Sequence, residues 1–366
     1  MKKIVIILYL ILLVVIAGCG GSGGNGGALG SGGNNGGSGS SPTIYIAGYY
    51  TNNAGNTIPC YWIGTNRTDL DNNGTIYGYA ESIYVSGGTI YTAGYYKDSN
   101  GVFKPCYWKG TTPIKLNATY QAYANSISVS GGTVYIAGTY WDSTGKKSFP
   151  CYWTSSNQTG LENPSGTNAT ANSIAVSGGT VYISGYYNKD SSNTNNDVPC
   201  YWAGQTQTPL DGKYGDAFAN GIFVSGGIVY TSGYSYDSNS KTFPCYWAGT
   251  SRTDLDNSND TFAYANSIFV SGGTVYTAGY YYADSIYVPC YWAGTSRTAL
   301  TCSSKTVDAA AGSICVFGGT VYTAGYHNDG TKNSPKWIPC FWIGTQWTDL
   351  PCNVLSYADA TSIFVQ

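Results

Sequence analysis

Short stretches in which apolar and polar side chains alternate recur along the chain from Thr43 onward. A typical stretch reads Thr-Val-Tyr-Thr-Ala-Gly-Tyr at 274–280, and such stretches are bounded by Gly, Asn, Asp or Ser. Enrichment in Val, Ile, Tyr and Thr between these residues indicates β-strands separated by turns. No part of this region has the 3.6-residue period of an amphipathic helix over a useful length. The pattern therefore predicts an all-β protein.

The strand pattern belongs to a repeat of about 45 residues. Its most constant part is the tetrapeptide Pro-Cys-Tyr-Trp, which becomes Pro-Cys-Phe-Trp in the last copy. Each tetrapeptide follows a stretch like Val-Tyr-x-Ala-Gly-Tyr and precedes Thr-x-Leu and then Ser-Ile-x-Val-Ser-Gly-Gly. The repeat occurs seven times, with its cysteines at Cys60, Cys106, Cys151, Cys200, Cys245, Cys290 and Cys340.

Four short strands in a repeat of this length, with a Trp in the third, resemble a blade of a WD40-type β-propeller. The Gly-His and Trp-Asp dipeptides of WD40 repeats are missing, so the resemblance implies the fold and not that family. The repeat is also similar to bacterial "VY-x-AG…YW" repeat proteins with no assigned chemistry. We name the strands a (Ser-Ile-x-Val, innermost), b (Val-Tyr-x-Ala-Gly-Tyr), c (Pro-Cys-Tyr-Trp) and d (Thr-x-Leu, at the rim).

The sequence thus predicts a seven-bladed β-propeller of four-stranded antiparallel blades over residues 42–366. The domain begins with strand b at Thr43 to Tyr50 and ends with strand a at Ser362 to Val365. We therefore expect the C-terminal strand to complete the first blade, which closes the ring and leaves no open sheet edge.

The spacing of the repeat predicts which face of the disc varies. The step from the Ile of strand a to the Gly of strand b, such as Ile83 to Gly94, is 11 residues in every instance. The step from the Trp of strand c to the Leu of strand d, such as Trp62 to Leu70, is always 8 residues. The b–c step varies from 11 to 15 residues and the d–a step from 11 to 14. One face therefore carries uniform tight turns and the other irregular loops.

Binding residues concentrate on loops held by a rigid scaffold, so the variable face is the predicted ligand face. The alternative is that these loops have drifted in length and bind nothing. Aromatic rings beside Asn, Ser and Asp suit a sugar or a protein partner. The candidate ligand-binding residues are Tyr140, Trp141, Asp142, Tyr187, Tyr281, Tyr282, His327 and Trp337.

The N-terminus has the form of an export signal. Lys2 and Lys3 precede an apolar run from Ile4 to Ala17, which is too short to span a bilayer but is typical of a signal peptide. The run ends in Ile-Ala-Gly-Cys, which resembles the lipobox of bacterial lipoproteins. The resemblance implies a signal peptide over 1–18, lipidation of Cys19 and a cell-envelope location. An ordinary signal peptide with an incidental cysteine is the alternative.

Residues 20–41 are almost wholly Gly, Ser and Asn, so the segment 19–41 is expected to be a flexible tether. The chain carries 17 Lys+Arg and 19 Asp+Glu, and only 10% of its residues are charged. Such low basic density argues against a nucleic-acid partner. We expect a monomer attached to the membrane by its N-terminal lipid.

The repeated cysteines are expected to be buried thiols rather than a metal or disulfide array, because equivalent positions on packed sheets lie about 10 Å apart. One disulfide among Cys302, Cys315 and Cys352 remains open. His327 is the only histidine and is expected to be an ordinary loop residue, which excludes a histidine-based triad. No cofactor and no metal are expected.

Carboxylates give two weaker leads. The Asp- and Asn-rich segments 69–74 and 254–260 could hold calcium, although turn and cap chemistry explains them equally well. A glycosidase needs two carboxylates, and Glu81, just before strand a, is a single candidate. The leading expectation is a non-catalytic lipoprotein that binds or scaffolds protein. A carbohydrate-binding propeller is the alternative, and a glycan-active enzyme the lesser one.

Overall fold

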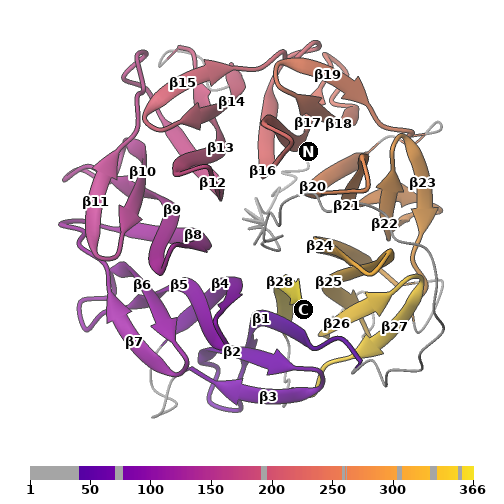
Figure 1. The fold of residues 1–366 in the computed structure, drawn as a ribbon, viewed down its shortest axis with the longest axis horizontal. Coiled ribbons are helices and arrows are strands. Elements are labelled where there is room, and N and C mark those ends of the chain that lie inside the picture. Colours follow the sequence, from indigo (N-terminus) through magenta and orange to yellow (C-terminus); the bar gives the residue numbers. More distant parts are fainter. Residues whose placement is uncertain are drawn as a thin grey trace, which may run out of the picture.

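Seven four-stranded antiparallel sheets stand radially around one axis in the computed structural model (Figure 1). The structure describes residues 41–70, 77–190, 196–257, 260, 262–302, 307–329, 336–352 and 357–366. The predicted signal peptide, Cys19 and all but the last residue of the tether lie outside these ranges. Within the described residues, no helix has the length and apolar character needed to cross a bilayer.

Each blade follows the predicted order from the axis to the rim. The blade sheets are ordered β28-β1-β2-β3, β4 to β7, β8 to β11, β12 to β15, β16 to β19, β20 to β23 and β24 to β27. The strands are β1 (Ile44–Thr51), β2 (Thr57–Ile63), β3 (Asn66–Asp69), β4 (Gly78–Ser86), β5 (Thr89–Lys97), β6 (Phe103–Lys109), β7 (Thr112–Lys115), β8 (Ala122–Ser130), β9 (Thr133–Trp141), β10 (Ser148–Thr154), β11 (Asn157–Gly160), β12 (Ala169–Ser177), β13 (Thr180–Asn188), β14 (Asp197–Ala203), β15 (Thr206–Pro209), β16 (Ala217–Ser225), β17 (Ile228–Tyr236), β18 (Thr242–Ala248), β19 (Ser251–Asp254), β20 (Ala263–Ser271), β21 (Thr274–Ala283), β22 (Ile286–Ala293), β23 (Ser296–Ala299), β24 (Ala309–Phe317), β25 (Thr320–Asn328), β26 (Trp337–Ile343), β27 (Gln346–Asp349) and β28 (Ala358–Val365).

The C-terminal strand closes the ring, as the repeat phase predicted. Strand β28 pairs antiparallel with β1, with Ile46 opposite Ile363. The Thr43 amide donates to the Gln366 carbonyl at 2.7 Å, which continues the pairing beyond the strands. One chain end therefore locks the other, and the first blade is built from both.

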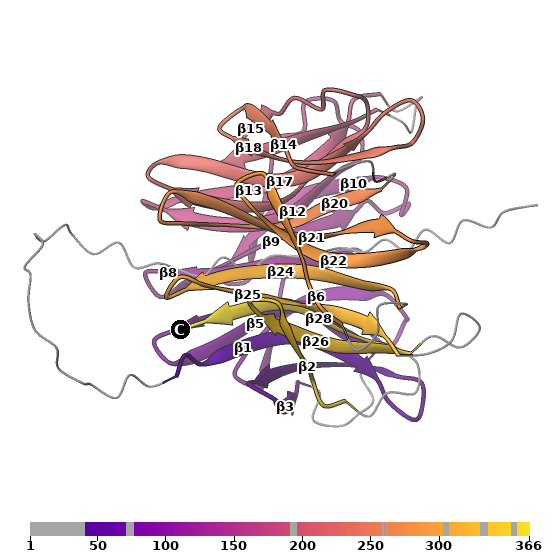
Figure 2. The same ribbon diagram turned by 90° about the vertical axis from the view of Figure 1, so that its right-hand side faces the viewer.

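The disc has two chemically distinct faces. We call the face with the a–b and c–d turns the turn face, and the face with the b–c and d–a loops the loop face. Figure 2 shows the disc edge-on, with the C-terminus on the turn face. The a–b turns are two-residue Gly-Gly turns such as Gly87-Gly88, with φ values of 54° and 73°. Positive φ at both positions is typical of a type I′ hairpin, which explains the invariant spacing.

The tetrapeptide of strand c forms the packing between blades. Its Cys and Trp alternate with Tyr, so they share one side of the sheet, and both are almost fully buried. The Trp202 Nε1 donates to the Glu162 carbonyl of the preceding blade at 2.7 Å. The same bond is made by Trp62, Trp153, Trp247, Trp292 and Trp342 to the residue after the strand-d Leu.

Strand a is longer than the Ser-Ile-x-Val stretch indicated. It starts several residues earlier and contains a β-bulge, as between Ala265 and Ser267 in β20. At this bulge the backbones of strands a and b approach closely. A Cβ on Gly279 of β21 would lie 1.8 Å from the Tyr264 carbonyl oxygen, so only glycine is tolerated there. Strand d, by contrast, ends one residue before its predicted Leu, which is buried just beyond the strand.

Residues at the bulge of strand a form hydrogen bonds between neighbouring blades. In β8, Asn125 Nδ2 donates to the Ala171 carbonyl of the next blade at 2.8 Å. The Ser that follows the bulge accepts from the next blade, as Ser82 Oγ does from the Ile127 amide at 3.1 Å. The side-chain amides of Asn172, Asn220 and Asn266 donate equivalent bonds to the next blade, and the Thr361 hydroxyl does the same.

Candidate functional site

The loop face presents three exposed tyrosines on three separate blades. The side chain of Tyr120 is 46% exposed, that of Tyr214 is 40% exposed, and that of Tyr287 is 37% exposed. Tyr120 and Tyr214 lie in the loops before β8 and β16, whereas Tyr287 lies near the start of β22. Large exposed rings of this kind are typical anchors of binding surfaces.

The ring of Tyr214 is held in place from two sides. It packs on Phe243 with a centroid separation of 4.4 Å, and the Lys213 Nζ lies 4.7 Å from its centroid. Lys213 in turn pairs with Asp254, which also binds Arg252. In this environment the Tyr214 side chain stays 40% exposed beside a charged pair.

Four of the predicted ligand-binding residues occupy one equivalent position inside strand b rather than loops. This position is the second after the strand-b Gly, and its side chain lies against the strand-c Cys and a residue of strand d. His327 in β25 is only 2% exposed and makes a 2.9 Å bond from Nε2 to Asp349 Oδ1. The predicted loop assignment of His327 is therefore wrong, because strand b extends further than its Gly-Tyr ending suggested. The other three candidates at this position are half-buried: Tyr140, Tyr187 and Tyr281.

In two blades an arginine of strand d covers this position. The Arg297 guanidinium lies 3.7 Å from the Tyr281 ring centroid and bonds to Asp260. The Arg67 guanidinium lies 4.0 Å from the ring of Tyr50. Cation–π contact of this kind fixes the ring and leaves it little freedom to bind a ligand face-on.

The remaining candidates lie where strand b or c meets the loop face. Trp141 contacts Tyr123 edge-on at 5.0 Å, Tyr282 contacts Tyr287 at 5.2 Å, and Trp337 contacts Tyr326 at 5.0 Å. The structure thus gives each of these three rings an aromatic neighbour. It does not gather the eight candidates into one centre, because they stand on four different blades.

The Asp142 side chain forms its hydrogen bonds within its own loop. Its Oδ1 accepts from the Thr144 hydroxyl at 2.8 Å and from the backbone amides of Thr144 and Lys146. The Thr144 hydroxyl bond is the main cause that lowers the pKa of this exposed carboxyl. The same Asx-turn geometry recurs at Asp98 and Asp237, so it belongs to the b–c loop of several blades.

Three described carboxylates of the two Asp-rich segments are paired with arginines. Asp69 binds Arg67 at 2.9 Å, Asp254 binds Arg252 at 2.6 Å, and Asp260 binds Arg297. Residues 71–76, 258, 259 and 261 of these segments lie outside the described ranges. Across the described residues, no group of three or more His, Cys, Asp or Glu side chains has a metal-binding arrangement.

The repeated cysteines are buried free thiols, as the strand alternation predicted. Burial raises the pKa of the Cys151 thiol well above its ordinary value, and the other six behave alike. Cys302 and Cys352 are also free thiols, so neither pairs with Cys315, which is itself disulfide-bonded. These sulfurs serve packing and have little thiolate character.

Sequence reasoning missed a pair of buried acids beside the axis. Glu81 in β4 occupies the bulge position that carries Asn in four other blades, and it is 4% exposed. Asp359 in β28, on the neighbouring blade, is 7% exposed. Burial raises the pKa of Glu81 to about 8, with a further contribution from Asp359, while a bond from Tyr95 opposes the shift. Burial raises the pKa of Asp359 to about 7.

The two acids are enclosed by phenol rings rather than open to the loop face. Tyr49 packs edge-on against Tyr79 at 4.7 Å and stacks on Tyr357 at 5.9 Å. Both acids raise the pKa of Tyr49, after the larger effect of burial. Because both carboxyls are almost fully buried between two blades, we assign them to the inter-blade framework. The sequence signal was the replacement of Asn by Glu81 in a repeat otherwise closely kept.

Comparison with known proteins places the fold but not the function. No protein-family model and no curated protein matches the chain. Among solved structures, a puromycin-hydrolysing peptidase of Mycobacterium tuberculosis is similar over 86% of this chain and 53% of its own length, at 11% identity and a TM-score of 0.56. The chain therefore spans about half of that protein.

Two archaeal proteins are similar at the same level. The β-propeller domain of the Trilobed protease of Pyrococcus furiosus is 10% identical, with coverage of 86% of this chain and 95% of that domain and a TM-score of 0.51. Acylaminoacyl peptidase of Pyrococcus horikoshii is 10% identical, with coverage of 86% and 52% and a TM-score of 0.52. The Pyrococcus furiosus domain is described as having an open velcro topology, whereas β28 closes the ring here. At these identities the likeness shows the β-propeller fold alone.

Proposed function

We propose that this chain is a membrane-anchored lipoprotein of the cell envelope whose propeller binds a protein partner through the loop face and performs no catalysis. The observation that carries the proposal is the distribution of Tyr120, Tyr214 and Tyr287 over three blades. Anchors spread across a face suit a broad protein surface of standard interface size, rather than one small molecule.

Charge on the loop face supports the same proposal. All described Asp and Glu residues lie in the b–c and d–a loops or in the loop-side halves of strands, and most lysines lie there too. Mixed charges around aromatic anchors give a polar rim that orients a protein partner. The anchor is proposed from the lipobox resemblance around Cys19 and from the apolar run that precedes it.

Glycan binding is the second candidate, and Tyr214 favours it. Its exposed ring, with Lys213 and the Asp254 carboxylate alongside, offers an apolar surface next to hydrogen-bonding groups. Sugars stack on such rings through their C–H faces while their hydroxyls bond to the polar groups. One ring would then carry most of the affinity, in contrast to three rings for a protein partner.

The test is site-specific photo-crosslinking of the full-length protein on intact cells. The photoreactive amino acid benzoylphenylalanine replaces Tyr120, Tyr214 or Tyr287 in separate variants. We expect one protein to be captured from all three positions, identified by mass spectrometry and lost when the other two tyrosines are changed to Ser. Capture from none of them would overturn protein binding.

A glycan array separates the second candidate. The full-length protein in detergent is applied before and after Tyr214→Ser, with Trp347→Ser as a control because that exposed ring lies on strand β27 at the rim. Specific sugar binding that only Tyr214→Ser abolishes would support the glycan candidate. Recovery of the protein from cells in the soluble fraction, with an unmodified Cys19, would overturn the lipid anchor.

A further inference from the structure

The turn face carries almost no charge. No Asp or Glu side chain occurs in any a–b or c–d turn or in the strand residues that flank these turns. Lys109, at the end of β6, is the single charged residue at these positions. The three arginines of the strands d, among them Arg252, reach toward loop-face groups such as Ser235 and Gly212. Contact with an apolar or interfacial phase would therefore require desolvation of only one charged side chain at these turn positions.

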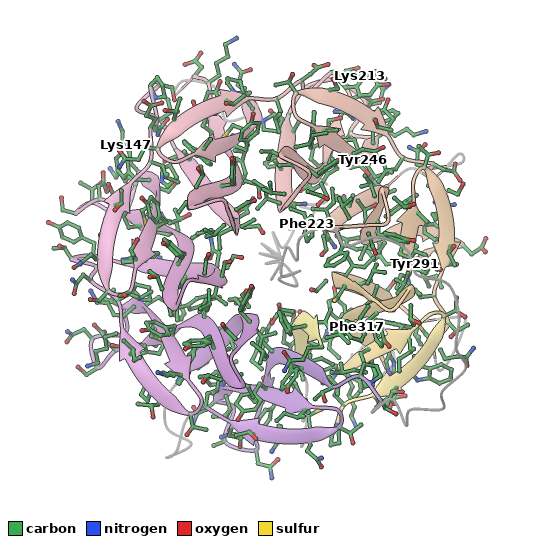
Figure 3. The ribbon with its side chains drawn as sticks, in the orientation of Figure 1. Lys147, Lys213, Phe223, Tyr246, Tyr291 and Phe317 are labelled. Atoms are coloured by element: carbon green, nitrogen blue, oxygen red, sulfur yellow. The ribbon has the colours of Figure 1, made fainter. Side chains whose placement is uncertain are left out.

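Large apolar side chains stand on this face where most blades have small ones. Phe317 is 42% exposed, Ile343 is 42% exposed and Ile63 is 37% exposed, and they lie on the adjacent blades of β24 to β27 and β28 to β3. Ile228 is 45% exposed on another blade. Figure 3 shows Phe317 on the face toward the viewer, beside the central opening.

The internal repeat shows that the fold does not require these side chains. The positions equivalent to Phe317 are Ser in five blades, and those equivalent to Ile228 are Thr in the other six. The positions equivalent to Ile343 and Ile63 are Ala in three blades. Each apolar residue thus replaces a smaller Ser, Thr or Ala that several equivalent blades carry.

The chain reaches this same face from its N-terminal side. Thr43 is hydrogen-bonded to Gln366 at the turn-face end of β1, so residue 41 lies near the blade that carries Ile63 and the adjacent blade that carries Phe317. A Gly- and Ser-rich chain as long as residues 20–41 would have a root-mean-square reach of roughly 25 Å if it behaved as a coil. A lipid at Cys19 would therefore hold the turn face near the bilayer at a high effective concentration.

We infer that the turn face docks on the lipid surface that holds the N-terminal anchor, with Phe317, Ile343, Ile63 and Ile228 entering the headgroup region. This inference rests on the lipid anchor of the proposed function. Exposed apolar and aromatic side chains on a surface with few charged side chains are features that favour the membrane interface. The loop face is then turned away from the membrane, toward a partner in the aqueous phase.

The experiment compares two positions of matched exposure in the full-length protein. Benzoylphenylalanine replaces Phe317 on the turn face or Tyr214 on the loop face, and the protein is reconstituted in phosphatidylethanolamine–phosphatidylglycerol vesicles and irradiated. We expect lipid adducts at least tenfold more abundant at position 317, measured by intact-protein mass spectrometry. Equal yields, no lipid adduct at 317, or a crosslink from 317 to a second copy of the chain would each overturn the inference.

A consensus variant controls for the photoreactive group itself. Ile63→Ala, Ile228→Thr and Ile343→Ala introduce the residues of equivalent blades, so the disc should stay folded, with an unchanged urea midpoint. In this background the adduct yield at 317 should fall at least threefold, and an unchanged yield would contradict docking through these side chains.

Failure of the anchor is separately visible. If Cys19 proves unmodified by mass spectrometry of the N-terminal peptide, the proposed location fails. The same protein is then added to preformed vesicles at millimolar lipid. Adducts at 317 would show that the face has its own affinity for lipid, and their absence would overturn the inference as well.

Discussion

The turn face and the loop face are made by the same seven blades, yet they differ in every surface property. The turn face has two-residue Gly-Gly turns, one charged residue and exposed Ile and Phe side chains. The loop face holds the described carboxylates, irregular loops and exposed tyrosines. Backbone geometry accounts for part of this, because a type I′ turn needs positive φ and so selects Gly, which brings no side chain. Function must account for the added apolar residues.

The packing between blades supports both faces, so substitutions there should have the largest effect on stability. Trp202→Ala removes a fully buried ring and its bond to the Glu162 carbonyl. We expect a loss of about 3–5 kcal/mol in the free energy of unfolding, measured by urea denaturation. Trp347→Ala is the matched control and should cost no more than about 0.5 kcal/mol, because that ring is 37% exposed. Similar losses in both variants would show that strand c is not the packing centre.

Stability should depend on pH through the loop-side half of the disc alone. Burial raises the pKa of Glu81 from 4.5 to about 8, so the folded protein holds this proton more tightly than the unfolded chain. Its stabilising effect is complete below about pH 4.5 and is lost as the pH rises to about 8. Asp359, with a pKa of about 7, acts in the same direction from a lower pH. The free energy of unfolding should therefore fall between pH 5 and pH 8.

Glu81→Gln isolates this effect. The amide stays neutral and keeps a donor at the position where Asn125 and its equivalents make inter-blade bonds. At pH 8 the variant should be about 1–4 kcal/mol more stable than the natural protein, since one pKa unit corresponds to about 1.4 kcal/mol. Urea denaturation at pH 5 and pH 8 measures it. Parallel stability curves for the two proteins would show that Glu81 does not titrate in this range.

The two cationic side chains that bind Asp254 on the loop face should contribute unequally to the free energy of unfolding. Arg252 is nearly buried and binds Asp254, the Gly212 carbonyl and Ser235, so Arg252→Ala should cost about 2 kcal/mol. Lys213 binds the same Asp254 from a more exposed position, and Lys213→Ala should cost less than about 1 kcal/mol. Thermal denaturation at low and high salt distinguishes them. Equal costs, both removed by salt, would show that the arginine is only a surface ion pair.

Substitution of an exposed apolar residue on the turn face should hardly change the free energy of unfolding. Phe317→Ser introduces the side chain that five other blades carry, so the free energy of unfolding should change by less than about 0.5 kcal/mol. The measurement is the urea midpoint of the protein in detergent. A loss above about 2 kcal/mol would place Phe317 in the core and weaken its assignment to a docking surface.

Local pattern and repeat spacing predicted most of the fold. Alternation identified the strands, and the phase of the repeat predicted ring closure by Ser362 to Val365. The same reasoning misjudged where strands end. His327 was expected in a loop but lies in β25. The antiparallel pairing of β25 with β26 continues to Asn328, two residues beyond the Gly-Tyr ending of strand b. Ladder length depends on the partner strand, which the local pattern does not contain.

What the sequence alone determined was whatever repeats with a fixed period: seven blades, buried Cys and Trp, uniform turns on one face and variable loops on the other. Only the tertiary structure decided which distant residues meet. Glu81 and Asp359 became neighbours because the last strand pairs beside the first, and Trp202 reached the Glu162 carbonyl because adjacent blades pack at a fixed angle. Periodicity records the geometry within a blade, whereas contacts across blades arise only when the ring closes.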